Sequence, residues 1–310
     1  MTNAILITGA TGQQGGAVID ALLATKADFE ILAVTRDTAS PSATKLAQKS
    51  PSIKLVQGNL DDVAAVFQSA KKATSRPIWG VFSVQLAIGV KSGTEERQGK
   101  ALIDHAIQSG VQYFVYASVD RGGATSLTKP ASLTNPTNVP HFIAKHRVEE
   151  HLFAATKDGA SGMAWTILRP TAYMENFLPT FFGRVFVTAW AQEVRDRPLQ
   201  MVGLKDIGVF AAKAFVAPEQ WAGKAVSLAG DEVTLKQVEE VFKTKTGKEL
   251  PRTYGFVSWF IMWMAKDFRL MMRWFYDHGF KADIAALRKE HPELKDFRTW
   301  LEKDSQFEMR

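Results

Sequence analysis

The chain has 310 residues, of which 46% are hydrophobic and 23% are charged, and its formal net charge is +6. This length allows one large domain or two modest ones, which can bury a core without disulfides or a structural metal. The absence of cysteine excludes disulfides, cysteine-ligated zinc, iron–sulfur clusters and thiol catalysis. No run of five like charges concentrates the positive charge, so composition predicts neither a nucleic-acid nor a membrane partner.

The start of the chain lacks the positively charged region of a signal peptide. The longest uncharged apolar stretches, Pro77–Val90 and Thr253–Ala265, are shorter than the roughly 20 residues of a membrane span. We therefore expect a soluble, cytoplasmic protein.

The first half of the sequence alternates short apolar runs with amphipathic patterns. Strands are predicted over Ala4–Thr8, Glu30–Thr35, Ile53–Gln57, Trp79–Val84, Tyr113–Ser118 and Trp165–Leu168. Helices are predicted near Gln14–Ala27, Pro41–Lys49, Asp61–Ala73 and Thr94–Ser109, and from Pro140 onward. Apolar strands separated by helices are typical of a parallel sheet covered on both faces. This pattern predicts the doubly wound α/β class.

Between these regions, the polar segment Arg121–Pro140 is predicted to be a long loop. Beyond residue 171 helical patterns dominate. We expect Asp206 to cap a helix over Ile207–Phe215, and Thr234-Leu-Lys-Gln237 fits a capping box. The sequence therefore predicts a first domain over residues 1–170 and a smaller, mostly helical lobe over 171–310, with some return to the first domain near 200–230.

The stretch Phe256–Phe280 contains too many Trp, Phe and Met residues for one helical stripe. A buried core is the first interpretation, and a pliable apolar lining for a hydrophobic substrate is the second. A membrane-surface helix ranks third, because the stretch carries Asp267 and Asp277 and has no Lys/Arg-rich face. The tail Lys281–Glu302 is predicted to be helical, with a buried stripe of Ile284, Leu287, Leu294, Phe297 and Leu301.

The sharpest local motif is Thr8-Gly-Ala-Thr-Gly-Gln-Gln-Gly-Gly16, which follows the first predicted strand and opens the first predicted helix. Glycines at 9, 12 and 15 permit a tight turn, close approach of the backbone to a pyrophosphate, and close packing of helix and strand. The helix N-terminus then favours phosphate. No Lys-Ser/Thr pair follows, which excludes a P-loop. We therefore predict a Rossmann-type dinucleotide site that includes Gly9, Thr11, Gly12, Gln13, Gln14 and Gly15.

The residues after the second predicted strand indicate whether the site binds NAD or NADP. Arg36 lies where a guanidinium can donate two hydrogen bonds to a 2′-phosphate. Asp37, one residue later, keeps NAD open as the alternative. We predict NADP(H), with Arg36 at its 2′-phosphate.

Taken in order, the motifs resemble the NmrA-like branch of the atypical short-chain dehydrogenase/reductases. The resemblance rests on Gly9–Gly15, Thr35-Arg36, Gly58–Asp62, Gly80–Gln85, Arg97–Lys100, His141–Lys145 with Val148–Glu150, Leu168–Asn176 and Asp206–Phe210. It implies that the adenine lies near Asn59 and Leu60, and that ribose and pyrophosphate are bordered by Ser83, Val84 and Gln85. It also implies that Lys145 reaches the nicotinamide ribose, and that the nicotinamide ring lies beside Pro170, Thr171, Tyr173 and Asn176.

The chain departs from active short-chain dehydrogenases at one position. Those enzymes place an acidic Tyr four residues before the Lys, whereas this chain has His141 four residues before Lys145. The two residues lie one helical turn apart, so either one is a candidate proton donor. For His141 the alternative is a polar position near a helix start. Tyr173 is a further catalytic candidate, with core packing as its alternative, and Ser118 matches a substrate-orienting Ser of uncertain role.

Three functions remain open. The first is an NADPH-dependent reductase of a small hydrophobic carbonyl, quinone or unsaturated compound, in a cleft between the lobes. The second is a non-catalytic NADP(H) sensor that acts through a regulatory protein partner, for which a nuclear location would follow. The third is a non-redox isomerase or cyclase that retains NADP(H). The apolar stretch favours an enzyme. We expect no metal, because the histidines form no ligand constellation with acidic residues, and no direct nucleic-acid contact.

Overall fold

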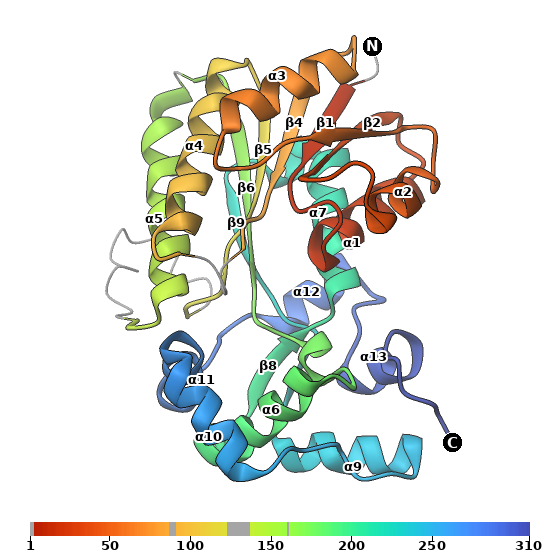
Figure 1. Cartoon of the computed structure of the whole chain (residues 1–310), viewed down its shortest axis with the longest axis vertical. Helices are drawn as coiled ribbons and strands as arrows, with labels where there is room; N and C mark the ends of the chain where they lie inside the picture. The colour runs from red at the N-terminus through yellow and green to blue at the C-terminus, as the bar shows by residue number, and fades with distance from the viewer. Residues whose placement is uncertain (1–2, 87–90, 123–136, 160) are drawn as a thin grey trace. The chain divides into compact units, whose positions relative to one another are not determined.

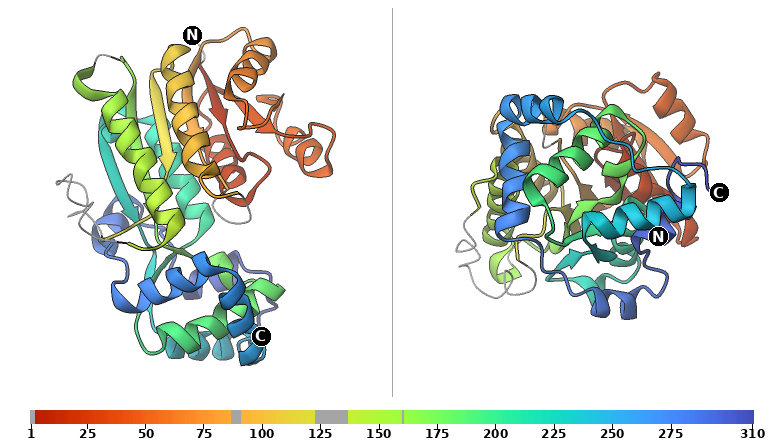
Figure 2. Two further views of the ribbon diagram at one scale, coloured as in Figure 1. Left: turned by 60° about the vertical axis from the view of Figure 1, so that its left-hand side comes forward. Right: turned by 90° about the horizontal axis from the view of Figure 1, so that it is seen from below.

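The computed structural model describes residues 3–86, 91–122, 137–159 and 161–310 (Figure 1, with further views in Figure 2). The described chain divides into two compact units. Unit 1 comprises residues up to Ser118, Ala144–Leu168 and Ile207–Ala225, and unit 2 comprises Val119–Ile143, Arg169–Asp206 and Val226–Arg310. Most of the predicted polar loop, residues 123–136, lies outside the described residues.

A seven-stranded sheet forms the centre of unit 1, in the order β3-β2-β1-β4-β5-β6-β9. The strands are β1 (Asn3–Ile7), β2 (Phe29–Thr35), β3 (Ile53–Gln57), β4 (Ile78–Ser83), β5 (Tyr113–Ala117), β6 (Ala164–Pro170) and β9 (Lys224–Leu228). Strands β1 to β6 run parallel. The order reverses between β1 and β4, which is the point where open α/β sheets bind ligands. The predicted doubly wound Rossmann class is confirmed.

Helices cover both faces of this sheet (Figure 1). They are α1 (Gln13–Ala24), α2 (Pro41–Ala47), α3 (Val63–Ala73), α4 (Thr94–Gln108), α5 (Pro140–Ala155), η3 (Lys157–Gly159), α7 (Leu204–Val216) and α8 (Pro218–Trp221). One buried cluster joins alternate strand residues such as Leu6, Leu32 and Phe114 to α3, α4 and α5. On the other face α7 packs against α1 so closely that a Cβ on Gly208 would lie 2.4 Å from the Ala17 carbonyl oxygen.

Unit 2 contains a smaller sheet and most of the remaining helices. Its strands, in the order β10-β8-β7, are β7 (Ala172–Tyr173), β8 (Leu199–Val202) and β10 (Asp231–Val233). Its helices are η4 (Met174–Phe177), α6 (Phe181–Ala189), η5 (Trp190–Val194), α9 (Leu235–Thr246), α10 (Gly255–Met264), α11 (Lys266–Asp277), α12 (Ile284–Glu290) and α13 (Phe297–Lys303). A cluster of aromatic and aliphatic side chains, including Phe186, Trp190 and Trp274, forms its core. No helix in the described ranges is long and apolar enough to cross a membrane.

The predicted ends of two helical segments of the second half require correction. Helix α7 begins at Leu204, so Asp206 lies in its first turn and does not cap it. The tail is not one helical segment: α12 ends at Glu290, because Pro292 disfavours helical geometry at the residue before it, and α13 starts at Phe297. The capping box of Thr234 and Gln237 at the start of α9 is confirmed.

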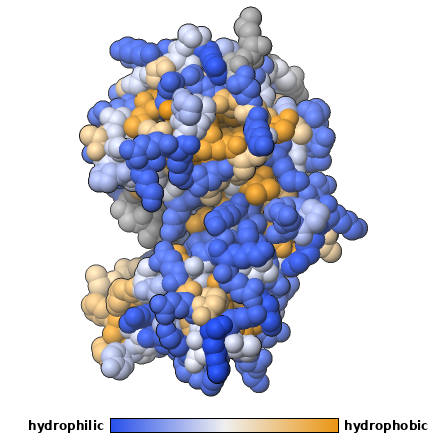
Figure 3. All heavy atoms as spheres, turned by 90° about the vertical axis from the view of Figure 1, so that its right-hand side faces the viewer, coloured by the Kyte–Doolittle hydropathy of each residue, from blue (hydrophilic) through white to orange (hydrophobic). Residues whose placement is uncertain are grey.

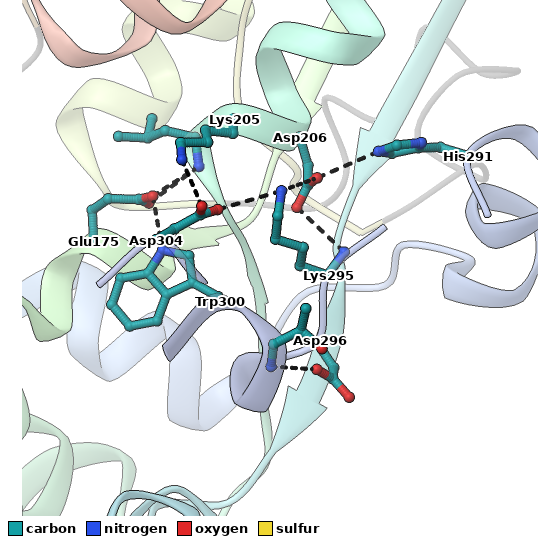
Figure 4. Close-up of polar contacts among 10 residues, drawn as sticks. Glu175, Lys205, Asp206, His291, Lys295, Asp296, Trp300 and Asp304 are labelled. Carbon is teal, nitrogen blue, oxygen red and sulfur yellow. Dashed lines mark hydrogen bonds and ion pairs between the residues drawn. The ribbon is translucent and has the colours of Figure 1, made fainter. Parts of the chain in front are cut away.

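Asp206 is instead part of a buried polar network in unit 2 (Figure 4). Its carboxylate lies 3.1 Å from Lys295 Nζ, which also lies 3.3 Å from Asp304. Burial alone would lower the pKa of Lys295, but these two carboxylates outweigh burial and raise it. The ammonium therefore holds the first turn of α7 to the C-terminal tail.

The aromatic stretch forms α10 and α11, and only part of it is buried. The expected burial is confirmed for Met262, Phe268, Met272, Trp274 and Phe275. It is wrong for five residues of α10, whose side chains are half exposed or more: Phe256, Trp259, Phe260, Trp263 and Met264.

Candidate active site

The glycine turn after β1 is as tight as the motif predicts. Gly9 has φ +60°, a left-handed conformation that favours glycine, and the Gly12 N–H donates to the Gly9 carbonyl at 2.9 Å. A Cβ on Gly15 would lie 2.3 Å from the Gly9 carbonyl oxygen, so only hydrogen fits there. The turn therefore brings the start of α1 into direct contact with the end of β1.

Thr8 connects this turn to β4. Its hydroxyl donates to the Val84 carbonyl at 2.9 Å and accepts from the Val84 N–H at 2.8 Å. A Cβ on Gly9 would lie 2.8 Å from Val84 Cγ1. The carboxyl ends of β1 and β4 are thus joined side by side, where the strand order reverses.

Helix α1 begins at Gln13, with Gly12 as its N-cap. The N-cap is a glycine, which has no side chain that could cap the first turn. Thr11 and Gln13 are exposed, and Gln14 is half-buried. An N-terminus of this kind is suited to a phosphate, because its first N–H groups point along the helix axis and carry partial positive charge.

Arg36 and Asp37 differ in the contacts that they make within the protein. The Asp37 carboxylate accepts the Ala39 N–H at 2.8 Å, and so closes its own turn. Arg36 is exposed and forms no ion pair with any described residue. The guanidinium is therefore available to an anionic ligand, whereas the carboxylate is engaged.

The ends of β3 and β4 hold the next predicted residues. Asn59 is exposed, and its amide oxygen accepts the Asp61 N–H at 3.2 Å, while Leu60 packs against the core. Ser83 and Gln85 are buried, and the Gln85 amide donates to the Ser83 hydroxyl at 2.9 Å. The other amide atom, Gln85 Oε1, is buried and accepts no hydrogen bond from the described residues. A buried acceptor without a donor is costly unless a ligand or water supplies one.

Lys145 belongs to α5, and its ammonium lies at the end of β5. Its ammonium donates to the Ala117 carbonyl at 3.0 Å and lies 2.9 Å from Glu95 Oε1. Both partners are in unit 1, and both charged side chains are almost fully buried. A buried ion pair of this kind holds the ammonium in one position.

The sequence predicts no role for two acidic partners in unit 1. Glu95 occupies the first turn of α4, where an acidic residue usually faces water and interacts with the helix dipole. Glu149 is buried on α5, one turn after Lys145, and accepts a hydrogen bond from Ser118. The Ser118 hydroxyl is therefore directed toward α5.

His141 lies in unit 2, near the start of α5, and is paired with Asp267. Its Nδ1 lies 2.7 Å from Asp267 Oδ1, and the imidazole is 9% exposed. Asp267 belongs to the first turn of α11, 126 residues away. The carboxylate selects the tautomer with hydrogen on Nδ1, so Nε2 remains the nitrogen that can face a ligand.

The remaining predicted residues surround a short turn in unit 2. Pro170 ends β6, and Thr171 donates hydrogen bonds from both its N–H and its hydroxyl to the Leu228 carbonyl, each at 3.0 Å. Tyr173 pairs with Val202 in the small sheet, and Asn176 lies in η4; both are half-buried.

Glu175 holds this turn in place. Its carboxylate accepts the Leu204 N–H at 3.1 Å and the Trp300 indole N–H at 3.0 Å (Figure 4). Burial raises the pKa of Glu175, although these hydrogen bonds oppose the shift. The motif Tyr-Met-Glu-Asn therefore contains a structural residue at its third position.

The site thus divides into two groups. In unit 1 the glycine turn, Arg36, Asn59 and Gln85 lie at the carboxyl ends of neighbouring parallel strands, which meet at one edge of a sheet, and the Lys145 ammonium reaches the end of β5 from α5. In unit 2 His141 is joined to Asp267, and residues 170–176 form a separate turn. Within the described ranges, no group of three or more His, Cys, Asp or Glu residues could hold a metal ion.

Comparison with known proteins identifies relatives along the whole chain. It is 28% identical over 268 residues to the NmrA-like family domain-containing oxidoreductase hkm9 of Aspergillus hancockii, covering 80% of this chain and 74% of that protein. It is 26% identical over 247 residues to quinone oxidoreductase 2 of Escherichia coli, covering 79% and 76%. The crystal structure of NmrA, a negative transcriptional regulator, in complex with NADP has the same fold, with a TM-score of 0.69, 18% identity and coverage of 98% and 95%. The model of the NmrA-like family matches residues 1–302, and the chain therefore belongs to the NmrA-like family.

Proposed function

We propose that this protein is an NADP(H)-dependent reductase of a small hydrophobic carbonyl, quinone or unsaturated compound. Its relatives include proteins named as oxidoreductases, one of them a quinone oxidoreductase. The observation that carries the proposal is the pair formed by His141 and Asp267, located one helical turn before the anchored Lys145. A protein that only bound the cofactor would need Lys145 but not an oriented imidazole.

The residues of unit 1 fit the cofactor chemically. The tight glycine turn and the N-terminus of α1 suit the pyrophosphate, and the buried Gln85 Oε1 suits a hydroxyl donor of the ligand. Arg36 suits a 2′-phosphate, because the guanidinium is unengaged while Asp37 is used by its own turn. When bound, the nicotinamide supplies a hydride.

The chain's own residues then have separate tasks. Lys145, held by Glu95 and the Ala117 carbonyl, positions the ribose through a hydrogen bond from its ammonium. With both ring nitrogens protonated, His141 can donate the Nε2 proton to the substrate oxygen or carbon, and it is left as the neutral tautomer whose Nδ1–H faces Asp267. Tyr173 is assigned to contact with the nicotinamide rather than to proton transfer, because it belongs to a strand pair.

The function is tested by measuring NADPH consumption with a panel of quinones, aldehydes and enones. His141→Gln should lower kcat by about 100-fold or more and leave NADPH affinity unchanged, because general acids contribute roughly 10²–10⁴-fold. His278→Gln, at an exposed histidine of unit 2, is the matched control and should have no effect. Equal turnover by His141→Gln and the parent protein would contradict the assignment of His141 as the proton donor.

The cofactor choice is tested by Arg36→Ala. Loss of a charge-assisted contact worth about 1.5–3 kcal/mol should weaken NADPH binding by roughly 10- to 150-fold and leave NADH binding unchanged. Lys54→Ala, at an exposed cation on β3, is the control. Equal NADPH and NADH affinities in the parent protein would contradict the assignment.

A non-catalytic sensor is the second candidate, because the structurally similar NmrA is a transcriptional regulator crystallised with NADP. It predicts that NADPH binds tightly and is not consumed by any compound of the panel. It also predicts that the NADP⁺- and NADPH-loaded proteins capture different partners.

A further inference from the structure

Helix α10 presents apolar side chains on the side where a surface helix normally has polar ones. Phe256, Trp259, Phe260, Trp263 and Met264 follow the i, i+3, i+4, i+7, i+8 spacing of one helical face, and each is 50–71% exposed. We call these five residues the aromatic face. Ser258 and Met262, on the opposite side of the helix, are buried and attach it to unit 2. The aromatic face is therefore a surface and not a poorly packed core.

Neighbouring residues of unit 2 extend this surface. Phe181 and Phe182 are exposed on α6, which packs against α10, and Tyr254 is exposed just before α10 and stacks on Phe256 at 5.8 Å. Figure 3 shows apolar side chains gathered at the lower left of the view. Contiguous exposed apolar patches mark interaction surfaces in soluble proteins.

The charges on α6, α10 and α11 determine which partner fits. Their acidic residues are Asp267 and Asp277, and both are paired, with His141 at 2.7 Å and Arg273 at 3.4 Å. Arg184, Lys266 and Arg269 are exposed and form no ion pair with the described residues. The two acidic residues that argue against a membrane surface in the sequence are thus each held by a partner side chain, and cations without an ion pair among the described residues border the apolar surface.

We propose that the aromatic face binds the surface of an anionic lipid bilayer, with α10 lying in the plane of the interface. Trp and Phe are favoured where an apolar environment meets water, and cations beside them are attracted to anionic headgroups. A second copy of the chain fits less well, because two such faces would bring their unpaired cations together. This contact is peripheral and requires no membrane-spanning helix.

The proposal is tested by flotation of the full chain with vesicles of phosphatidylcholine alone and of equimolar phosphatidylcholine and phosphatidylglycerol. Binding is expected only to the anionic vesicles, with a blue shift of tryptophan emission. The double variant Trp259→Gln/Trp263→Gln should lose at least tenfold in partitioning and lose the blue shift, because it removes apolar area from the contact. Lys266→Gln/Arg269→Gln should lose about 30-fold, as two charges near the surface imply.

Matched controls separate this surface from general stickiness. Phe153→Gln removes an exposed aromatic residue of α5, and Lys71→Gln/Lys72→Gln removes two exposed cations of α3; neither should change binding. Failure to float with anionic vesicles, or equal binding to neutral ones, would overturn the proposal. A dimer in solution that Trp259→Gln/Trp263→Gln converts to a monomer, without vesicle binding, would overturn it in favour of a second copy.

Discussion

Two adjacent glycines of α1 allow a paired test of how closely this helix packs on the nucleotide turn. A Cβ on Gly15 would meet three backbone atoms of Thr8 and Gly9 at 2.3–2.9 Å, and backbone cannot rotate aside as a side chain can. A Cβ on Gly16 would have the Ala10 carbonyl oxygen at 3.7 Å as its nearest neighbour, an ordinary contact. Gly15→Ala and Gly16→Ala therefore make the same chemical change one residue apart, with opposite consequences.

The magnitudes follow from two opposing effects. Alanine is favoured over glycine within a helix by about 1 kcal/mol, so Gly16→Ala should raise the free energy of unfolding by about 0.5–1 kcal/mol. In Gly15→Ala the Cβ lies roughly 1 Å inside ordinary contact distance, and overpacking of this kind costs about 1–3 kcal/mol. Gly15→Ala should therefore lower the free energy of unfolding by about 1–2 kcal/mol net.

Urea unfolding and calorimetric titration with NADPH measure both consequences. Gly15→Ala should also weaken NADPH binding at least tenfold, because α1 must move away from the turn, whereas Gly16→Ala should bind NADPH like the parent chain. If Gly15→Ala were as stable as Gly16→Ala and bound NADPH equally well, the close packing of α1 on the turn would be refuted.

Three further predictions concern ionisable side chains. Lys145→Met should lower the free energy of unfolding in urea by about 3 kcal/mol, because Glu95 is left buried without its cation. Adding Glu95→Gln should restore most of this loss. Equal stability of the single and double variants would contradict the prediction. Asp267→Asn should lower kcat at least tenfold with KM little changed, because the imidazole loses its orienting carboxylate. An unchanged kcat would show that Asp267 does not position His141 for proton transfer. Burial raises the pKa of Glu175, so its contribution to stability is present below the unfolded-state pKa of about 4.3 and is lost as pH rises through the folded-state pKa. Glu175→Gln should therefore reduce the fall in the free energy of unfolding just above a pH of about 4.3. An unaltered profile of stability against pH would refute the shift.

Local patterns predict the first half of the fold well. The strands and helices up to β5 lie within a few residues of their predicted limits, because each is a continuous apolar run or an amphipathic stretch bounded by a turn. Strands β7 to β10 are not predicted. They have two to five residues, too few for an alternating pattern to stand out. The sequence also does not predict the exposure of Trp259 and Trp263. A run of apolar residues favours burial, and hydropathy cannot distinguish a buried face from an exposed apolar one.

The site shows the same division between local and long-range information. The glycine turn lies within one short segment, and its geometry follows from residue types that are adjacent in the sequence. The partners of the catalytic candidates do not. Glu95 is 50 residues before Lys145, and Asp267 is 126 residues after His141, so only the folded chain brings these charges together.

The central claim is that the protein uses NADPH to reduce a bound substrate. It is tested most directly by a single turnover, in which protein loaded with one equivalent of NADPH is mixed with each compound of the panel. NADPH absorbance and the mass of the product are followed together. We predict that at least one compound gains two hydrogens for each NADPH oxidised, and that His141→Gln slows this step. Tight NADPH binding with no oxidation by any compound would contradict the claim.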